Sequence, residues 1–299
     1  MFLLPASACL NLDHLLSNTE LALLCQYVEN HVVGSACGFM DQMTCAHARA
    51  DHLFSLHCQH LPNPPFHHVT LPSNIQFFAI DSGVKRSTAS SAYQRVRTAA
   101  FIGRQLIKLS NYQDHLCQLS LSLSQFNNQY RMLLPERMFG RDCLTSSHFD
   151  PLSPIDNNEI YPVRAATAHP IEENYRVQLY ERILKIDHHL STDDLFTLGE
   201  LMFQSDAGYT SCDLHSEETR LLVNLIRHER LSSKTLLGAK ITGGGGGGTV
   251  AVLTRKSPHA VEEIQDVIQR YETLTKRQTR VFSGSSSGLI AYPPQRLNT

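Results

Sequence analysis

The 299-residue sequence lacks several features that would assign it to particular classes of protein. No stretch approaches the ~20 consecutive apolar residues that a membrane-spanning helix needs. The eight cysteines include no CxxC pair, which argues against a zinc ribbon or a dithiol redox motif. Lysine and arginine are scattered over a chain of formal net charge −2, so no basic stripe could neutralise a run of nucleic-acid phosphates. We therefore expect neither a membrane nor a nucleic acid as partner.

The chain also shows no sign of a targeting segment or of a histidine metal site. The opening Met1-Phe-Leu-Leu-Pro lacks the basic segment of a signal peptide, so we expect folded chain there. The isolated cysteines are typical of reduced thiols in a cytoplasmic protein. The pairs His67-His68 and His188-His189 lack a partner at i+3 or i+4 beside a carboxylate, so we expect no metal ligands in either pair.

What is present indicates a globular protein of mixed structure. With 42% apolar residues and no tryptophan, the chain can bury a sizeable core, and its length favours two domains. Prolines punctuate a polar stretch between Phe149 and Pro170, and we place the domain boundary there. The expected division is a first domain over residues 1–155, a second over 156–285 and a loose Ser/Gly-rich tail over 286–299.

Hydrophobic spacing predicts both helices and strands. Helical spacing follows Thr19, a possible N-cap, and recurs further along the chain; short apolar runs typical of strands alternate with it. The expected helices are 19–33, 92–110, 171–184, 192–202, 217–228 and 261–273, and the expected strands are 75–80, 236–242, 249–253 and 279–282.

A run of six glycines, Gly243, Gly244, Gly245, Gly246, Gly247 and Gly248, is the most unusual local feature. Composition alone favours a flexible linker. The flanking Ala239-Lys-Ile-Thr and Thr249-Val-Ala-Val-Leu instead favour a loop inside a sheet, where glycines permit positive φ and close approach of the backbone to a phosphate or to another loop.

Asp41 is the candidate catalytic acid–base residue. It stands in Cys37-Gly-Phe-Met-Asp-Gln, after a glycine-bearing turn, where a side chain can face a cavity and orient or deprotonate a substrate hydroxyl. The alternative is an aspartate that caps the helix beginning there. The hexapeptide alone leaves both possibilities open.

Several segments together resemble one superfamily. Glu29-Asn-His-Val-Val-Gly-Ser-Ala-Cys-Gly-Phe-Met-Asp-Gln is similar to a segment ending in C-G-x-M-D-Q, and Gly238-Ala-Lys-Ile-Thr followed by the glycine run is similar to the motif G-A-[KR]-[MI]-T-G-G-G-x-G-G. Asp81-Ser-Gly-Val-Lys-Arg-Ser, the stretch from Val163 to Val177, and Leu198-Gly-Glu-Leu-Met resemble further segments in the same order. The chain thereby resembles the galactokinase, homoserine kinase, mevalonate kinase and phosphomevalonate kinase (GHMP) superfamily. Within that superfamily, the sequence of these segments is more similar to L-arabinokinases than to galactokinases.

The resemblance implies a fold and a set of roles. It implies an α+β fold with a two-domain architecture: a truncated N-terminal domain and a ferredoxin-like C-terminal domain. Asp41 matches the catalytic aspartate, which takes or orients the proton of a sugar's anomeric hydroxyl as that hydroxyl attacks the γ-phosphate. Tyr93 and Gly38 match sugar-binding positions, and Gly243 to Gly248 match a loop beside the phosphates. The family uses ATP and Mg²⁺, with a monosaccharide as the second ligand.

Three departures from the family pattern bear on activity. The first family motif, an arginine followed by G-E-H-x-D-Y, has no match, and near the place of the second, P-x-x-x-G-L-S-S-S-A-A, only Pro5-Ala-Ser-Ala-Cys-Leu is found. Arg86 stands where the family usually has histidine. We therefore expect an incomplete sugar-1-kinase for L-arabinose or galactose, in which binding of ATP and Mg²⁺ is in question. The alternative is a non-catalytic remnant or a sugar- and nucleotide-sensing module.

Overall fold

The computed structural model describes residues 16–35, 37–58, 64–85, 91–107, 122–143 and 154–292. The chain divides into two compact units. The small unit comprises Met1–Leu71 and Ser285–Thr299, and the large unit comprises Pro72–Gly284. Both contain helices and strands, so the expected α+β class is confirmed. This division differs from the boundary at 155/156, which rests on proline spacing and remains a prediction.

In the small unit, two helices pack against a two-stranded antiparallel sheet. Helix α2 (Asn18–His31) confirms the predicted helix, but its cap is Ser17, whose hydroxyl accepts the N–H of Glu20 in a reciprocal capping box. Helix α3 (Met40–His47) follows, and strands β1 (His52–Leu56) and β2 (Phe66–Thr70) pair with each other. The buried core lies between α2, α3 and the sheet, and consists of Ala22, Phe39, Met43 and Ala46 with Phe54 and Phe66 against them.

The end of the chain returns to this small unit. The N–H of Gly288 donates to the carbonyl of Ala48 at 2.7 Å, and Leu289, in the short helix η4 (Leu289–Ala291), packs against Leu21 and Cys25. The first residues of the tail expected to be loose are therefore held in place. Residues 293–299 lie outside the described ranges.

The large unit contains a four-stranded antiparallel sheet of ferredoxin-like order. In chain sequence its strands are β3 (Ile75–Asp81), β6 (Leu236–Ile241), β7 (Thr249–Arg255) and β8 (Arg280–Ser283), and their order in the sheet is β6-β7-β3-β8. Numbered one to four, the order is 2-3-1-4, which is that of a β-α-β-β-α-β unit. The first strand is supplied by residues 75–81, far upstream of the other three.

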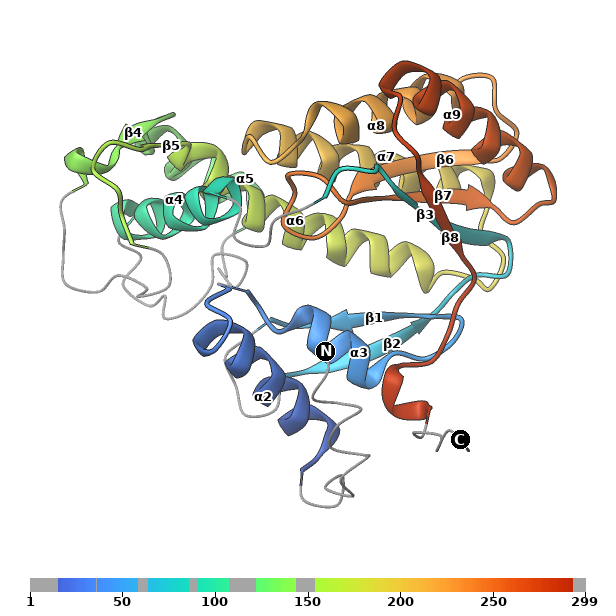
Figure 1. Cartoon of the computed structure of the whole chain (residues 1–299), viewed down its shortest axis with the longest axis horizontal. Helices are drawn as coiled ribbons and strands as arrows, with labels where there is room; N and C mark the ends of the chain where they lie inside the picture. The colour runs from blue at the N-terminus through green and yellow to red at the C-terminus, as the bar shows by residue number, and fades with distance from the viewer. Residues whose placement is uncertain are drawn as a thin grey trace. The chain divides into compact units, whose positions relative to one another are not determined.

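Helices α8 (Glu217–Glu229) and α9 (His259–Thr275) lie together against this sheet (Figure 1). Leu222, Ile226, Ile264 and Val267 from the two helices meet Ile80, Val250 and Val252 of the sheet in one buried cluster. Helix α7 (Thr192–Ser211) packs on the edge strand β6 and runs beyond the predicted end at residue 202.

A second core joins the remaining helices of the large unit. Helices α4 (Ser91–Ile107), α5 (Leu123–Gln129) and α6 (Val163–Leu184) pack together with the short strands β4 (Met138–Phe139) and β5 (Ile160–Tyr161). The helix expected over 171–184 begins earlier, because α6 starts at Val163 and runs through Pro170. Proline inside a helix typically costs ~3 kcal/mol. Burial of Ala166, Thr167 and Ala168 offsets that cost, since Gly103 of α4 leaves room for the Thr167 side chain.

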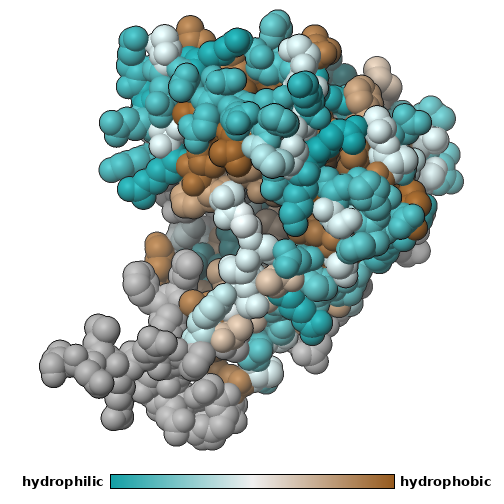
Figure 2. Space-filling view, turned by 90° about the vertical axis from the view of Figure 1, so that its right-hand side faces the viewer, coloured by the Kyte–Doolittle hydropathy of each residue, from teal (hydrophilic) through white to brown (hydrophobic). Residues whose placement is uncertain are grey.

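No helix within the described ranges is long and apolar enough to cross a membrane. Figure 2 shows that hydrophilic residues cover most of the face turned to the viewer and that apolar residues occur there in small groups.

Candidate functional site

The six glycines form an ordered turn within the sheet. Strands β6 and β7 pair up to Ile241 and Val250, and the N–H of Thr242 donates to the carbonyl of Thr249. Residues 243–248, the glycine loop, connect them, and φ is positive at Gly243, Gly245, Gly246, Gly247 and Gly248, from 64° to 132°. Side-chain-bearing residues rarely adopt such φ values. Of the two possibilities left open by the sequence, the loop inside a sheet is confirmed.

Two neighbouring segments form hydrogen bonds with the glycine loop. Gly246 donates its N–H to the carbonyl of Leu214, just after α7, at 2.7 Å. Gly248 donates to the carbonyl of Val84, after β3, and its own carbonyl accepts the N–H of Ser82. A Cβ at Gly245 would lie 2.3 Å from the carbonyl oxygen of Leu214. The loop therefore needs glycine for contact as well as for conformation.

Some donors of the loop remain available. Within the described part of the chain, no acceptor receives the N–H groups of Gly244, Gly245 or Gly247, all of which are buried residues. Buried backbone N–H groups without a partner are rare in folded proteins. Successive N–H groups in such turns can bind anions, phosphate among them. The loop is thus suited to receive the oxygen atoms of a ligand.

Asp41 lies in the first turn of α3 and is exposed. The residue at the N-cap is Phe39, so Asp41 is not the cap of this helix. No described residue forms a hydrogen bond or an ion pair with the Asp41 carboxylate. Gly38, also exposed, immediately precedes this turn. The structure therefore brings Gly38 and Asp41 together at the start of α3, with the carboxylate available to a ligand.

Glu29 is a neighbour of this turn that the sequence reasoning missed as a site residue. The thiol of Cys37 donates to Glu29 Oε2 at 3.2 Å, and the N–H of Cys37 donates to the side chain of Asn30 at 3.0 Å. Burial and the hydrogen bond to Glu29 raise the pKa of Cys37 to about 11. The charge of Asp41 adds a smaller upward effect on the same pKa. Two carboxylates therefore lie near one protonated thiol.

The other predicted residues lie in the large unit. Tyr93 is half-buried on α4, the helix that packs against α6. The glycine loop belongs to the sheet of this unit, whereas Asp41 and Gly38 belong to the small unit. Arg86 lies outside the described residues. Among the described residues, no group of three or more histidine, cysteine, aspartate or glutamate side chains could hold a metal ion.

A cluster of charged residues beside the glycine loop was also missed. Lys240, which precedes the loop, places its ammonium 3.0 Å from Glu173 Oε1 on α6. Arg176 donates from Nε to Glu173 Oε2 at 2.7 Å. Burial acts to raise the pKa of Glu173, but the Lys240 charge and the hydrogen bonds from Ser205, Arg176 and Lys240 prevail and lower it to about 2. Lys240 stands in the quoted glycine motif, but no local pattern indicates its partner.

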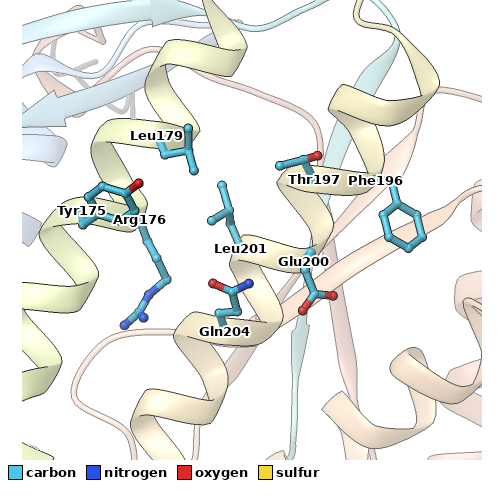
Figure 3. A pocket seen from close by; sticks show the side chains of 8 residues that line it. All are labelled: Tyr175, Arg176, Leu179, Phe196, Thr197, Glu200, Leu201 and Gln204. Carbon is cyan, nitrogen blue, oxygen red and sulfur yellow. The ribbon is translucent and has the colours of Figure 1, made fainter. Parts of the chain in front are cut away.

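A groove of about 250 Å³ lies between α6 and α7 (Figure 3). None of the residues predicted from the sequence lines it. Arg176 belongs both to this groove and to the Glu173 cluster. The other lining residues are Tyr175, Leu179, Phe196, Thr197, Glu200, Leu201 and Gln204.

Comparison with known proteins tests the predicted family. Residues 193–273 match the model described as GHMP kinases C terminal. The chain is 35% identical over 307 residues to L-arabinokinase of Arabidopsis thaliana, covering 90% of this chain and 29% of that protein. It is 28% identical over 259 residues to galactokinase of Pasteurella multocida (strain Pm70), covering 86% of this chain and 57% of the relative. These matches support the predicted membership of the GHMP kinase superfamily.

A solved structure agrees with this assignment at the level of the fold. Galactokinase of Lactococcus lactis, crystallised with galactose, superposes with a TM-score of 0.69 at 19% identity, over 93% of this chain and 62% of that one. The predicted fold is therefore confirmed. The chain spans less than two thirds of the length of each of these relatives.

Proposed function

We propose that this chain is part of a sugar-1-kinase that transfers the γ-phosphate of ATP to the anomeric hydroxyl of L-arabinose or galactose. The observation that carries the proposal is the exposed, unengaged Asp41 at the start of α3, in a chain 35% identical to an L-arabinokinase. An exposed carboxylate without a protein partner is free to approach a substrate hydroxyl. A cytoplasmic location fits the proposal, and none of the six described cysteines forms a disulfide.

Each proposed role is the one that the matching family motif implies for the residue. Asp41 accepts or orients the proton of the anomeric hydroxyl, whose oxygen forms a bond to the γ-phosphorus as the bond to the ADP oxygen breaks. Gly38 and Tyr93 contact the sugar. The unpartnered N–H groups of the glycine loop donate to phosphate oxygens. In such a transfer the protein acts mainly by positioning and by stabilising charge.

ATP and Mg²⁺ fit the described residues to different degrees. The buried glycine N–H groups without partners fit a phosphate. When bound, Mg²⁺ would neutralise part of the charge on the phosphates during the transfer. The described residues present no group of three or more metal-ligating side chains, so none of the roles above is routed through Mg²⁺.

A second candidate function is a sugar- or nucleotide-binding module without catalysis. The buried glycine N–H groups favour it, because no described residue supplies them with an acceptor and they can hold a phosphate without any group transfer. The same monosaccharides and ATP are the expected ligands of such a module.

A coupled assay of ADP release separates the two candidates. The 299-residue chain is tested with L-arabinose, galactose and no sugar, beside the D41N variant. The sugar-1-kinase predicts sugar-dependent ADP release that D41N lowers by ~10²-fold or more. Sugar or nucleotide binding by calorimetry without any turnover would support the binding module instead. If the chain shows neither turnover nor binding, both candidate functions are contradicted.

A further inference from the structure

We infer that Glu173 is a positioning residue for the glycine loop, because its carboxylate ties the end of β6 that enters the loop to helices α6 and α7. The inference rests on the proposed function in one respect only, namely that the glycine loop binds phosphate. The positioning itself is a property of the fold and can be measured without turnover.

Three elements converge on the Glu173 carboxylate. Glu173 extends from α6 and receives the ammonium of Lys240, from β6, at 3.0 Å on Oε1. The hydroxyl of Ser205, from α7, donates to the same oxygen. Arg176 donates to Oε2 from one turn further along α6. All the donors are largely withdrawn from water, with side-chain exposures of 12% for Arg176 and 25% for Lys240. The carboxylate therefore fixes β6, α6 and α7 at one point.

Helix α7 extends the same connection into the glycine loop. Tyr209 lies one turn after Ser205, and its hydroxyl donates to the carbonyl of Gly243 at 2.7 Å. The ammonium of Lys240 lies 5.6 Å from the centroid of the Tyr209 ring. Asp206 accepts the N–H of Ile241 at 3.1 Å. The face of α7 that contacts Glu173 therefore also determines where the first loop residue lies.

The packing between α6 and α7 is adapted to this cluster at Gly208. A Cβ there would lie 2.4 Å from His169 Nδ1 and 3.4 Å from Arg176 Nη2. The ring of His169 contacts that of Tyr209 edge-on, with centroids 5.2 Å apart. The absence of a side chain at Gly208 thus leaves room for two residues of α6, His169 and Arg176. His169 contacts Tyr209, and Arg176 donates to Glu173.

Loss of the Glu173 charge is expected to loosen the loop rather than the whole sheet. The Lys240 ammonium would lose its partner, and a partly buried cation without a partner moves toward water. Such a movement pulls the end of β6 away from α7. The far end of β6 is held independently, because Glu263 of α9 accepts from the Ser233 hydroxyl at 2.6 Å and from the Lys234 N–H at 2.9 Å.

That second carboxylate supplies a matched control. The variants E173Q and K240M interrupt the tie at the loop end of β6, and E263Q interrupts the tie at the opposite end. Amide hydrogen exchange of the peptide covering residues 243–248 is measured in the full chain, with the urea midpoint as a check on folding. We expect exchange about tenfold faster in E173Q and K240M, and close to wild type in E263Q.

The outcomes decide the inference even if one variant fails to fold, since K240M keeps the carboxylate and E173Q keeps the lysine. Wild-type exchange in a folded E173Q or K240M would overturn it, as would equal acceleration in E263Q. A calorimetric titration with ATP addresses the phosphate role, and about tenfold weaker binding in E173Q and K240M but not in E263Q is expected. If the wild-type chain binds no ATP, the proposed function fails, and the exchange result still decides the positioning role.

Discussion

Gly199 of α7 and Gly238 of β6 pack backbone against backbone. A Cβ on Gly238 would lie 2.4 Å from the carbonyl oxygen of Gly199, and a Cβ on Gly199 would lie 1.9 Å from the carbonyl oxygen of Leu237. This approach brings α7 directly onto the edge of the sheet. Asp206, two turns further along α7, can then accept the N–H of Ile241. The side chains that reach the glycine loop thus depend on a contact made about two turns earlier in the helix.

The variant G199A is therefore expected to destabilise the large unit by about 1–3 kcal/mol, the usual range for overpacking a well-packed site. The measurement is the free energy of unfolding in urea. G38A serves as the control, because a Cβ at Gly38 meets nothing within 4 Å. Equal free energies of unfolding for the two variants would contradict the close contact.

Within the glycine loop, the contact with Leu214 can be separated from the positive φ. Gly245 has φ 77° and its added Cβ would lie 2.3 Å from the Leu214 carbonyl oxygen, whereas Gly284 has φ 91° and open space around it. G245A should lower the free energy of unfolding by about 1–3 kcal/mol more than G284A, since both carry backbone strain but only one carries the overlap. Thermal unfolding of the two variants provides the comparison. Equal losses would show that backbone strain alone accounts for the glycine.

Local patterns predict much of the fold but not its connections. The helices near 19–33 and 217–228 and the strands beside the glycine run follow from periodicity and flanking residues, and the structure contains them. The start of α6 is predicted too late because a local rule about proline ignores the packing of α6 against α4. The pairing of β3 with β7 depends on long-range burial, which no short window of sequence contains.

In the candidate site, too, some features follow from local sequence and others do not. The turn before Asp41 and the positive φ values of the glycine loop follow from the residue types in a few consecutive positions. The bond between Glu173 and Lys240 joins two charged residues that are remote in sequence, and each alone is typical of a solvated surface. Only the packing of both α6 and β6 against α7 shows that they are partners.

The rate at which the Cys37 thiol is alkylated reports on the structure of the turn before Asp41. Burial and the hydrogen bond to Glu29 raise the pKa of its thiol to about 11, so it is expected to react slowly with iodoacetamide at pH 8. The substitution E29Q removes a charge that favours the protonated thiol, and it should speed alkylation of Cys37. Mass spectrometry of the Cys37 peptide gives the rate. Cys212, in the large unit, has a pKa raised to about 12 by burial and is the internal control.

An unchanged Cys37 rate in E29Q would contradict the hydrogen bond between the thiol and the carboxylate. Acceleration of both cysteines together would indicate general unfolding rather than a local effect. Only a selective increase at Cys37 supports the geometry of the turn.

The acid stability of the large unit should depend on Glu173. The folded-state pKa of Glu173 is about 2, below its ordinary value of 4.5, so the ionised carboxylate stabilises the fold above that ordinary value. This contribution, on the order of 3 kcal/mol at most, is lost as the pH falls from 4.5 towards 2. E173Q should therefore be less stable than wild type at pH 7 and should lose less stability over this acid range. The measurement is the free energy of unfolding in urea at pH 7, 4 and 3, with E263Q as the comparison at the other end of β6. A difference between wild type and E173Q that stays constant from pH 7 to pH 3 would show that the Glu173 charge does not stabilise the contact with Lys240.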